Sequence, residues 1–553
     1  MSMASILYDE ILTDLYNQIH RKLERSDLAD QRFAKVGTAQ EVLAPFNLKR
    51  LFCSLVPSGD SLEDHFGRDI TVDVLVSRTE ERSLQNFLAI LIYARCSVKS
   101  ARGFVTKLLI PSEYDGFNHL PAEREQLDHV FGTENTPDII SFMDTQSCFC
   151  PIVLYEGEDV QVADGKKQRL PYVSDPKYID TGSYGIVYSV VIAKGHLANR
   201  HTHMANTEAK PMARKDFKKV NELHKEYEIM KRILHTPRKS NNIVETFGSL
   251  QLDETTFSLF MPLAECDLRV WMKEHNPPIF ESKKADILMC ASGLADGLEF
   301  LHSEIRDSNG NKMVCYHMDL KPANILVFPD DREPGKMIWK ISDFGMSRVK
   351  MSHRHATLDD TDISVLFEKR GGETSASGTV NRRFEATYLA PESSISMRTM
   401  NEKSDVWSLG CVISVVLTYL SEGQAGIEQY SEDRATISQR SGAGNMDRFF
   451  LVGRSLTQLK PHPAISKHHK HLIGKANQGR PGEGRLIENV LKYIEEKVLH
   501  LEPDRRVSAE SVRDKLLNAS AYYQMLSDND DGHDDHDHLG NRALSWWQKP
   551  FHR

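Results

Sequence analysis

A change in the spacing of apolar residues near residue 170 places the strongest constraint on the fold. The stretch from Pro171 to Val191 holds glycine and alternating β-branched residues, which is typical of strands. From about residue 281 the helical period takes over, and Ile287, Cys290 and Leu294 share one helix face. Leu409–Leu420 predicts a further buried helix. A strand-rich region that precedes a helix-rich one indicates an α+β fold with two unequal lobes.

The first 165 residues predict a separate, mainly helical domain. An apolar residue recurs at every fourth position near the start and lays a stripe along one helix, formed by Leu7, Ile11, Leu15, Ile19 and Leu23. Leu84–Ala94 is apolar on all sides and predicts a buried helix. The stripe needs a surface to bury against: the domain's own core, the downstream lobes or another protein chain. We expect residues 1–165 to fold apart from the lobes and to modulate them, and the lobes to fold without these residues.

The net charge and the cysteines narrow the class of protein. The 553 residues include 69 Lys and Arg against 78 Asp and Glu, a formal net charge of −9, which disfavours a nucleic-acid binder. Eight cysteines show no disulfide framework, which favours a reducing compartment. The apolar runs fall short of the ~18–20 residues of a membrane span, and the first residues lack the basic segment of a signal peptide. We expect a soluble cytoplasmic protein, with the nucleus as the alternative.

Two glycines between strand-like flanks are the first candidate for binding chemistry. They stand in the run Ile179-Asp180-Thr181-Gly182-Ser183-Tyr184-Gly185-Ile186-Val187. The spacing of Gly182 and Gly185 permits a tight β-turn whose backbone N–H groups can approach phosphates. Taken alone, the run fits an ordinary glycine hairpin better.

Two charged residues downstream also have two interpretations each. Lys215 ends the strand-like run Met212-Ala213-Arg214-Lys215, where a single lysine is usually a solvated edge residue. Glu226 opens a helical run and could be one more exposed helix charge.

Four ordered motifs decide between these interpretations. They are His317-Met318-Asp319-Leu320-Lys321-Pro322-Ala323-Asn324-Ile325-Leu326, Ile341-Ser342-Asp343-Phe344-Gly345, Ala390-Pro391-Glu392 and Asp405-Val406-Trp407-Ser408-Leu409-Gly410. In this order, after the glycine run and Lys215, they resemble the protein kinase family. The resemblance covers about residues 174–518 and implies a bilobal protein kinase fold, with a small β-rich N-lobe and a large helical C-lobe. The layout also resembles multidomain kinases of filamentous fungi.

The resemblance implies a site for ATP. Lys215 is similar to the strand lysine that holds the α- and β-phosphates, and Glu226 to its helix ion-pair partner. Met261 corresponds to the residue that gates the back of the nucleotide pocket. The full set that the resemblance assigns to the nucleotide is Ile179, Gly182, Ser183, Gly185, Val187, Ala213, Lys215, Glu226, Met261, Leu263, Ala264 and Leu326.

The resemblance also assigns the reacting groups. Asp319 corresponds to the base that accepts the proton of the substrate hydroxyl, and Lys321 to the residue that supports the γ-phosphate. Asn324 and Asp343 would hold Mg²⁺ or Mn²⁺, because such ions prefer carboxylate and carbonyl oxygens. Asn324 thus counts both as a catalytic and as a metal-binding residue.

The residue types in the catalytic loop imply a protein acceptor and a class of hydroxyl. The run Asp319-Leu320-Lys321-Pro322-Ala323-Asn324 resembles the serine/threonine version of the loop, since tyrosine kinases usually place Arg or Ala where Lys321 stands. The expected reaction is therefore transfer of the γ-phosphate of ATP to Ser or Thr of a protein, in intracellular signalling. Glu392 is expected to pair with Arg506 in a structural role.

Three departures keep a second hypothesis open. Asp180 stands where the first glycine of the phosphate loop is expected, and Met318 replaces an arginine that in many family members binds a phosphate on the activation segment. Glu385 stands where many members have a threonine, although Thr387 lies close by. These changes motivate a pseudokinase scaffold, which binds nucleotide and partners without efficient turnover.

Three segments fall outside the motifs. The insertion Gly195–Pro211 is expected to be a solvated loop, and the segment from Asp343 to Glu392 is long and includes the polar run Gly371–Thr379. Residues 519–553 form an acidic tail that contains histidines and is expected to be disordered. Trp546 and Trp547 in this tail are candidates for folding back or for binding a partner.

Overall fold

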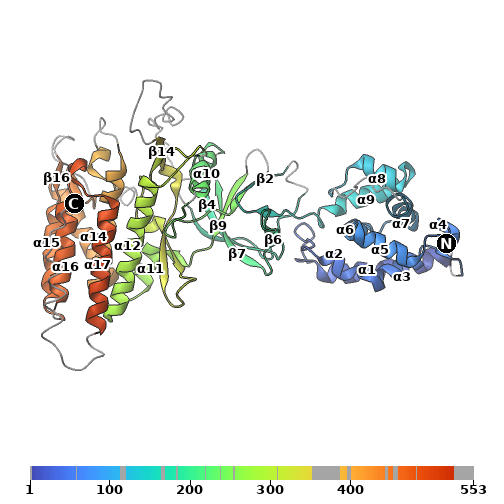
Figure 1. Cartoon of the computed structure of the whole chain (residues 1–553), viewed down its shortest axis with the longest axis horizontal. Coiled ribbons are helices and arrows are strands. Elements are labelled where there is room, and N and C mark those ends of the chain that lie inside the picture. The colour runs from blue at the N-terminus through green and yellow to red at the C-terminus, as the bar shows by residue number, and fades with distance from the viewer. Residues whose placement is uncertain are drawn as a thin grey trace, which may run out of the picture. The chain divides into compact units, whose positions relative to one another are not determined.

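In a computed structural model, the chain divides into two compact units (Figure 1). The first comprises residues 1–223 and 246–263, and the second comprises residues 224–245 and those from 264 onward. The structure describes residues 3–528, with interruptions at 26, 58, 112–119, 163–167, 182–184, 218–219, 237, 253–255, 308, 352–386, 395–399, 443–445, 453–458 and 481. The runs 371–379 and 529–553, including Trp546 and Trp547, lie outside the described residues. The prediction of a disordered tail from residue 519 is wrong for residues 519–528, which belong to helix α17 (Ala509–Asp528) and bury Ala519 and Tyr523.

The first unit begins with a helical region that has its own apolar core. Its helices are α1 (Met3–Lys22), α2 (Thr38–Val42), α3 (Pro45–Cys53), α4 (Leu62–Phe66), α5 (Val72–Glu81), α6 (Gln85–Tyr93), α7 (Val98–Phe104), which continues as a π-helical turn (Val105–Leu109), α8 (Arg124–Phe131) and α9 (Thr136–Gln146). Helix α6 is buried from Phe87 to Ile92, which confirms the buried helix that the all-round apolar sequence predicted.

The buried stripe of α1 differs from the predicted one. Leu7 is exposed, whereas Tyr8 and Leu12 are buried together with Leu15 and Ile19. A strict four-residue spacing drifts around a helix that has 3.6 residues per turn, so the buried face moves from one row to the next. The stripe packs within the helical region's own core, which was one of the three surfaces left open by the sequence.

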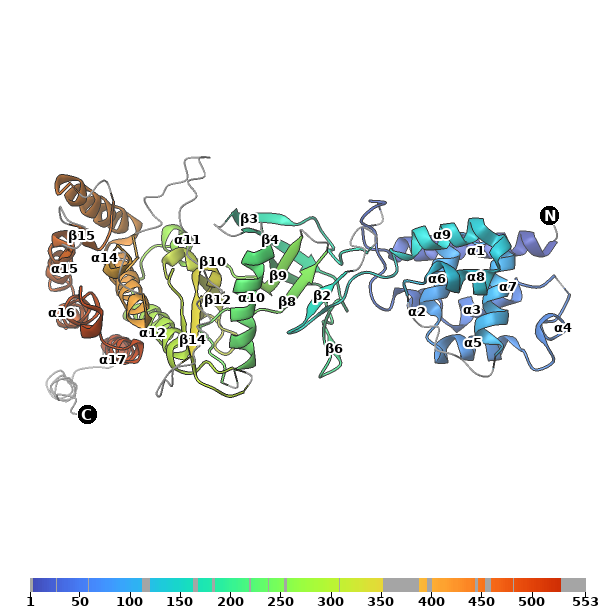
Figure 2. The ribbon, with the colours of Figure 1, turned by 90° about the horizontal axis from the view of Figure 1, so that it is seen from above.

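The first unit continues into a sheet of six strands with the order β2-β8-β9-β7-β4-β3. The strands are β2 (Asp159–Gln161), β3 (Lys177–Thr181), β4 (Gly185–Ile192), β7 (Lys210–Phe217), β8 (Gly248–Gln251) and β9 (Phe257–Pro262). All neighbours are antiparallel except β2 and β8, which run parallel (Figure 2). A smaller sheet, β1-β5-β6, consists of Leu154–Tyr155, Leu197–Asn199 and Met204–Ala205.

The insertion before Lys215 therefore has structure, where the sequence predicted a solvated loop. Strand β5 pairs in parallel with β1, and His196 just before β5 is buried. The Nδ1 of His196 lies 3.0 Å from the carbonyl oxygen of Ile152, and burial lowers the pKa of the ring, so the neutral imidazole donates this bond. His201 and His203 are exposed.

Strands β1 and β2 precede residue 165, so the sheet-bearing region starts earlier than the expected boundary. Ile152 and Leu154 are buried in the same apolar cluster as Val190 and Phe260 of the sheet. A Cβ on Gly248 would lie 2.8 Å from the carbonyl oxygens of Tyr155 and Glu158, so the turn between β1 and β2 lies close against the start of β8. The segment 151–162 is thus part of the sheet's edge.

Because residues 151–162 belong to the sheet's edge, we expect a fragment without them to be less stable than one that keeps them. A fragment that starts at residue 165 loses β2 and the buried side chains of Ile152 and Leu154, and it exposes the pairing edge of β8. We expect its midpoint of thermal unfolding to lie roughly 5–10 °C below that of a fragment starting at residue 151. Differential scanning calorimetry on both fragments measures this, and equal midpoints would contradict the assignment of 151–162 to the sheet.

The second unit is mainly helical. Its helices are α11 (Leu268–Glu274), α12 (Glu281–Ser303), α14 (Glu402–Arg440), α15 (Pro463–Ala476), α16 (Glu483–Tyr493) and α17 (Ala509–Asp528), and most of α10 (Val220–His235) belongs to the same unit. Helices α12 and α17 lie side by side, and Ser520 donates a 2.8 Å hydrogen bond to the carbonyl of Ala285 (Figure 1). A strand-rich region followed by a helix-rich unit confirms the α+β class.

Short strands complete the second unit. They are β10 (Cys266–Asp267), β11 (Met313–Tyr316), β12 (Ile325–Pro329), β13 (Met337–Ile341), β14 (Arg348–Met351), β15 (Phe450–Val452) and β16 (Leu459–Pro461). The pairs are β10-β12-β13, β11-β14 and β15-β16. Of these pairs, β12-β13 and β15-β16 are hairpins of consecutive strands, and the first of them positions two of the sequence motifs, as described below.

Helix α14 carries the apolar stretch Leu409–Leu420 and is kinked at Gly423, which has a φ of 65°. Within the part of the chain that the structure describes, α14 is the one helix that is long and apolar enough to span a membrane. Its most apolar window is 89% buried within the protein, as for a core helix. The buried helix predicted from the sequence is therefore confirmed.

His462 makes the stability of the second unit depend on pH. Its Nδ1 accepts the N–H of Ala464 at the start of α15 and its Nε2–H donates to the carbonyl of Arg434, 3.1 Å away, so the neutral ring is fully bonded. Burial, aided by the charge of Arg434, lowers the pKa of His462 from 6.5 to about 4.

Because the unfolded chain takes up a proton near pH 6.5 and the folded one does not, stability is lost as pH falls below that value. We expect this histidine to contribute roughly 1–2 kcal/mol to the difference between pH 7.5 and pH 5. His462→Asn keeps an N-cap acceptor but does not titrate, so urea unfolding should show a smaller pH dependence in this variant. If the free energy of unfolding depends on pH in the same way in the wild type and in His462→Asn, His462 does not contribute to that dependence.

Candidate active site

The catalytic-loop residues predicted from the sequence converge in the second unit. The Nζ of Lys321 donates to Oδ2 of Asp319 over 2.8 Å. The Nδ2 of Asn324 donates to the same Oδ2 over 3.0 Å and to the backbone carbonyl of Asp319 over 2.8 Å. One carboxylate is therefore held in place by a cation and an amide. The amide oxygen of Asn324 takes part in neither of these two bonds, since both use the nitrogen.

The β12-β13 hairpin explains why Asn324 and the Asp343 motif meet. The register pairs Ile325 with Ile341, so the residue before β12 lies opposite the residue after β13. The backbone N–H of Ser342 donates to the carbonyl of Asn324 over 2.9 Å, and the hydroxyl of Ser342 donates to the same oxygen over 3.0 Å. Asp343 follows directly, which brings the two predicted metal ligands to one end of the hairpin.

His317 ties the two motifs together from beneath. It is fully buried, and its Nε2–H donates to the carbonyl of Ser342 over 2.9 Å. Its ring also packs edge-on against Phe344, with centroids 5.2 Å apart. The other ring nitrogen lies 3.4 Å from the N–H of Asp319. A single buried side chain thus connects Asp319 to the segment that carries Asp343.

Asp405, near the start of α14, holds the backbone of the catalytic loop. Its two carboxylate oxygens accept the N–H groups of His317 and Met318, each over 2.8 Å. His302 lies 3.0 Å from the same carboxylate. Met318 has a φ of 69°, an uncommon value for a residue with a side chain. The carboxylate stabilises this strained turn immediately before Asp319.

Asp343 has a similar backbone conformation, with a φ of 62° and a ψ of 77°. It precedes a short 3₁₀ turn, Phe344–Met346, in which Phe344 is buried. Left-handed backbone at residues with side chains is costly and occurs mostly at functional sites. Met318 and Asp343 are two of the six described non-glycine residues with positive φ, and they belong to the two motifs that the resemblance identified as catalytic.

Burial gives the Asp319 carboxyl a raised pKa. Loss of solvent around the charged form raises the pKa, and the neighbouring Lys321 only partly opposes this effect. The nearby carboxylate of Asp343 adds to the increase. A raised pKa makes a carboxylate a stronger proton acceptor, so the electrostatics of Asp319 suit a general base.

In the first unit, four of the residues predicted to bind the nucleotide lie on one face of the sheet. Val187 lies opposite Lys215 in the β4-β7 register, and Ala213 lies opposite Met261 in the β7-β9 register. Alternate residues of a strand point to the same face, so these four residues share a face. Arg214, on the other face, donates to Asp216 over 2.7 Å.

The glycine run is described only in part. Gly182 and Ser183 lie outside the described residues, whereas Gly185 begins β4. A Cβ on Gly185 would lie 2.4 Å from the carbonyl oxygen of Asp216, so only glycine allows this approach of β7. Ile179 is exposed and lies at an irregularity of the β3-β4 register.

Asp180, the residue in place of the first glycine, accepts the N–H of Thr181 over 2.8 Å. Its side chain is exposed on β3. The carboxylate therefore makes a local bond to the backbone of its own strand. Glu385, another departure from the family pattern, lies outside the described residues.

The remaining predicted residues lie at four places. Lys215 and Glu226 are both buried, so neither is the solvated charge that the alternative interpretation proposed. Leu263 is the last residue of the first unit and Ala264 resumes the second, so the chain passes from one unit to the other between these two residues that the resemblance assigns to the nucleotide. Leu326 lies on β12, opposite Asp267.

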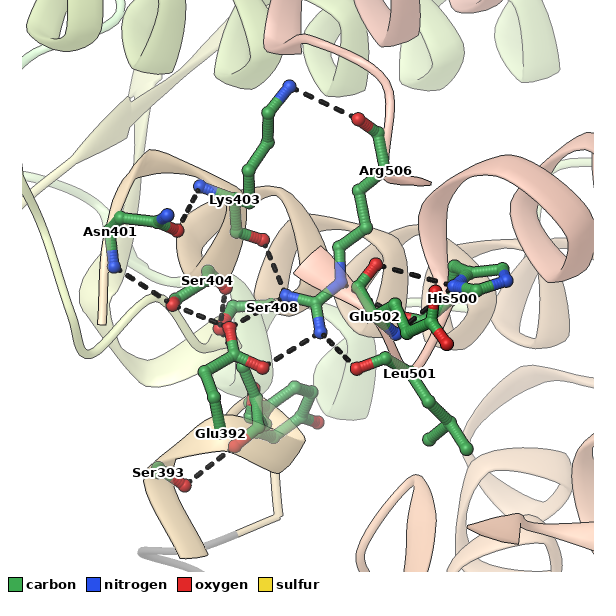
Figure 3. Close-up of polar contacts among 12 residues, drawn as sticks. Glu392, Ser393, Asn401, Lys403, Ser404, Ser408, His500, Leu501, Glu502 and Arg506 are labelled. Atoms are coloured by element: carbon green, nitrogen blue, oxygen red, sulfur yellow. Dashed lines mark hydrogen bonds and ion pairs between the residues drawn. The ribbon is translucent and has the colours of Figure 1, made fainter. Parts of the chain in front are cut away.

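The predicted pair of Glu392 and Arg506 is confirmed (Figure 3). Arg506 donates two hydrogen bonds to the carboxylate, of 2.7 and 2.8 Å, and both side chains are at most 1% exposed. Ser404 donates to the same carboxylate over 2.6 Å, and Arg506 also donates to the carbonyl of Lys403. Burial disfavours the charge of Glu392, but the bonds and charge of Arg506 outweigh it, so the pKa lies below its ordinary value.

The resemblance implied only a structural role for Asp405, and no role was predicted for His317 or Ser342, although all three stand in the quoted motifs. A place in a motif does not by itself show which groups a side chain contacts. Their importance follows from contacts between segments that are distant along the chain. Asp405, for example, bonds residues 88 and 87 positions away.

Comparison with known proteins agrees with this geometry. Residues 175–516 match the family model of the protein kinase domain, which is more than half of the chain, so the chain belongs to this family. It is 26% identical over 270 residues to a leucine-rich repeat receptor-like serine/threonine-protein kinase of Arabidopsis thaliana, a region that is 48% of this chain and 25% of the relative.

Two further relatives show that the similarity extends across the family. The mitogen-activated protein kinase kinase kinase dlk-1 of Caenorhabditis elegans is 28% identical over 278 residues, 49% of this chain and 23% of the relative. Fibroblast growth factor receptor 1 of Xenopus laevis is 26% identical over 213 residues, 36% of this chain and 21% of the relative. The chain thus covers about a quarter or less of the length of these three curated relatives.

Proposed function

We propose that this chain is an ATP-dependent protein kinase that transfers the γ-phosphate of ATP to serine or threonine hydroxyls of proteins. One observation carries the proposal: the carboxylate of Asp319 is held by Lys321 and Asn324 at the end of the hairpin that also leads to Asp343. Membership in the protein kinase family supports it. The proposal includes the nucleotide roles that the resemblance assigns to Lys215 and Glu226.

The residues present suit a divalent cation. Asp343 offers a carboxylate, and Asn324 offers an amide oxygen because its nitrogen is committed to Asp319. Mg²⁺ is commonly held by one or two such oxygens together with substrate phosphates. When bound, the ion would neutralise charge on the phosphoryl oxygens during transfer. Asn324 and Asp343 would hold it.

The chain's own groups then perform three tasks. Asp319 accepts the proton of the acceptor hydroxyl with its carboxylate, whose Oδ2 is held by Lys321 and Asn324, and its raised pKa favours this role. Lys321 orients that carboxylate through its 2.8 Å bond and adds positive charge next to it. His317 and Asp405 fix the backbone of the loop, so that little reorganisation is needed during the reaction.

A pseudokinase scaffold is the second candidate. Met318 favours it, because a thioether at this position cannot bind an activation-segment phosphate as a guanidinium does. The same observation fits a kinase whose basal activity does not require a phosphate there. None of the groups held around Asp319 is missing, so we retain the active kinase as the first proposal.

An assay with radiolabelled ATP and Mg²⁺ or Mn²⁺ on generic protein substrates separates the two. Asp343→Ala and Lys215→Met serve as controls, with ATP binding measured for each protein by calorimetry. Turnover by the wild-type protein above that of both variants supports the kinase. Wild-type protein that binds ATP but turns over no faster than the variants would establish the scaffold.

The choice of acceptor is a separate prediction. Lys321 in the loop resembles the serine/threonine version, and one relative named above is a serine/threonine-protein kinase. We expect phosphoamino-acid analysis of the products to give phosphoserine and phosphothreonine. Predominant phosphotyrosine would overturn this choice while leaving the kinase proposal intact.

We further propose that the protein works in a reducing compartment, the cytoplasm or the nucleus. All eight cysteines are free thiols in the structure, which supports this location.

A further inference from the structure

The segment that leads into Ala390-Pro391-Glu392 is tied to a loop far along the chain. The hydroxyl of Thr387 donates to Oδ1 of Asp447 over 2.5 Å, across 60 residues of sequence. Both residues are only 2% exposed. A buried charge-assisted hydrogen bond of this kind is among the stronger polar contacts in proteins. The bond fixes one residue of the segment to the loop between α14 and β15.

Arg434 compensates the buried charge of Asp447. Its Nε–H donates to the backbone carbonyl of Asp447 over 2.9 Å, and its guanidinium lies 3.8 Å from the carboxylate. The guanidinium also stacks over the rings of Tyr430 and Phe449, at 4.0 and 4.2 Å from their centroids. Ser431 donates to the second carboxylate oxygen over 2.6 Å. The acceptor of the Thr387 bond is therefore held rigidly.

The same helix that precedes this loop holds the catalytic loop. At the start of α14, Asp405 binds the backbone just before Asp319, and one turn later Ser408 donates to the carbonyl of Tyr388 over 2.8 Å. The segment 387–392 and the catalytic loop are thus anchored to adjacent turns of one helix. An acceptor whose hydroxyl reaches Asp319 must therefore lie next to the segment that starts at Thr387.

We propose that Asp447 is a positioning residue: through Thr387 it fixes the acceptor side of the active site, with Arg434 as its counter-charge. This inference rests on the proposed kinase function. Asp447 lies in none of the sequence motifs. It acts on the active site through the hydrogen bond that it accepts from the Thr387 hydroxyl. Loss of that bond loosens the chain from 387 to 392 without removing any group that holds ATP or metal.

Two variants of Thr387 test the proposal. Thr387→Val keeps the shape and removes the donor, whereas Thr387→Ser keeps the donor and removes a methyl group. With a peptide acceptor at saturating ATP, we expect Thr387→Val to raise KM for the peptide at least tenfold, with kcat changed less than threefold and KM for ATP unchanged. Thr387→Ser should stay within threefold of the wild type in all three constants.

Hydrogen exchange of the full-length protein, followed by mass spectrometry, gives a readout that does not need turnover. Amides in residues 387–394 should exchange at least tenfold faster in Thr387→Val than in the wild type or Thr387→Ser. Unchanged exchange, or an unchanged KM for the peptide in an active enzyme, overturns the proposal. If the wild-type protein shows no turnover, the proposed function is wrong, and so is the role of Asp447 in positioning an acceptor. The exchange experiment then still decides whether the Thr387–Asp447 bond holds residues 387–394 in place.

Discussion

Replacing Asp319 by Asn is expected to lower kcat by 10²–10⁴-fold, about 3–5 kcal/mol in the barrier. The amide has nearly the same size, so Lys321 and Asn324 can still pack around it, but it cannot accept the proton of the acceptor hydroxyl. Steady-state kinetics with a protein substrate measure the change. The affinity for ATP should stay within a factor of about three, because Asp319 is assigned no contact with the nucleotide.

The pH dependence of the wild-type enzyme offers a check on the same residue. The pKa of Asp319 is raised by burial, and the base works only when ionised, so kcat/KM should fall as pH drops through that raised pKa. The residual activity of Asp319→Asn should lack this acidic limb. A variant that retains more than a tenth of wild-type kcat, or that keeps the limb, would contradict the role of Asp319 as base.

The parts of the site that could be predicted are those set by local sequence. The catalytic loop, the hairpin after it and Asp343 occupy one continuous stretch, and the strands that pair Ile325 with Ile341 are two apolar runs joined by the loop of residues 330–336. Once the motifs are in order, the convergence of Asp319, Lys321 and Asn324 needs no distant partner. The pair of Glu392 and Arg506 is distant, and only the family resemblance made it predictable.

The parts that could not be predicted depend on pairing between distant segments. Strand β2 is three residues long and joins the sheet through β8, some 90 residues further on, where Ser249 donates to Asp159 over 2.6 Å. So short a strand has no periodicity of its own. Thr387 and Asp447 likewise form a bond that neither residue signals alone. In α1, the choice between Leu7 and Tyr8 as the buried residue depends on how the helix rotates against α6, which tertiary packing decides.

The largest stability effect is expected at Glu392. Glu392→Ala leaves the buried guanidinium of Arg506, which lies over the ring of Trp407, without its carboxylate, and removal of one partner of a buried pair typically costs about 3–5 kcal/mol. Urea unfolding of the full chain at pH 7.5 measures the loss. The pKa of Glu392 in the folded protein lies below the ordinary value of 4.5, so the contribution of its charge is present above that pH and is lost as pH falls through the folded pKa.

Arg505, the neighbour of Arg506, provides a matched control. It forms an ion pair of 2.8 Å with Glu502, but both side chains are more than half exposed, at 68% and 60%. Solvent-exposed pairs of this kind contribute about 0–1 kcal/mol, so Arg505→Ala should hardly change the unfolding midpoint. Equal losses for Glu392→Ala and Arg505→Ala would mean that burial does not set the strength of the Glu392 pair. A loss confined to Glu392→Ala, and smaller at pH 4 than at pH 7.5, would instead show that the desolvated charge of Arg506 depends on its carboxylate partner.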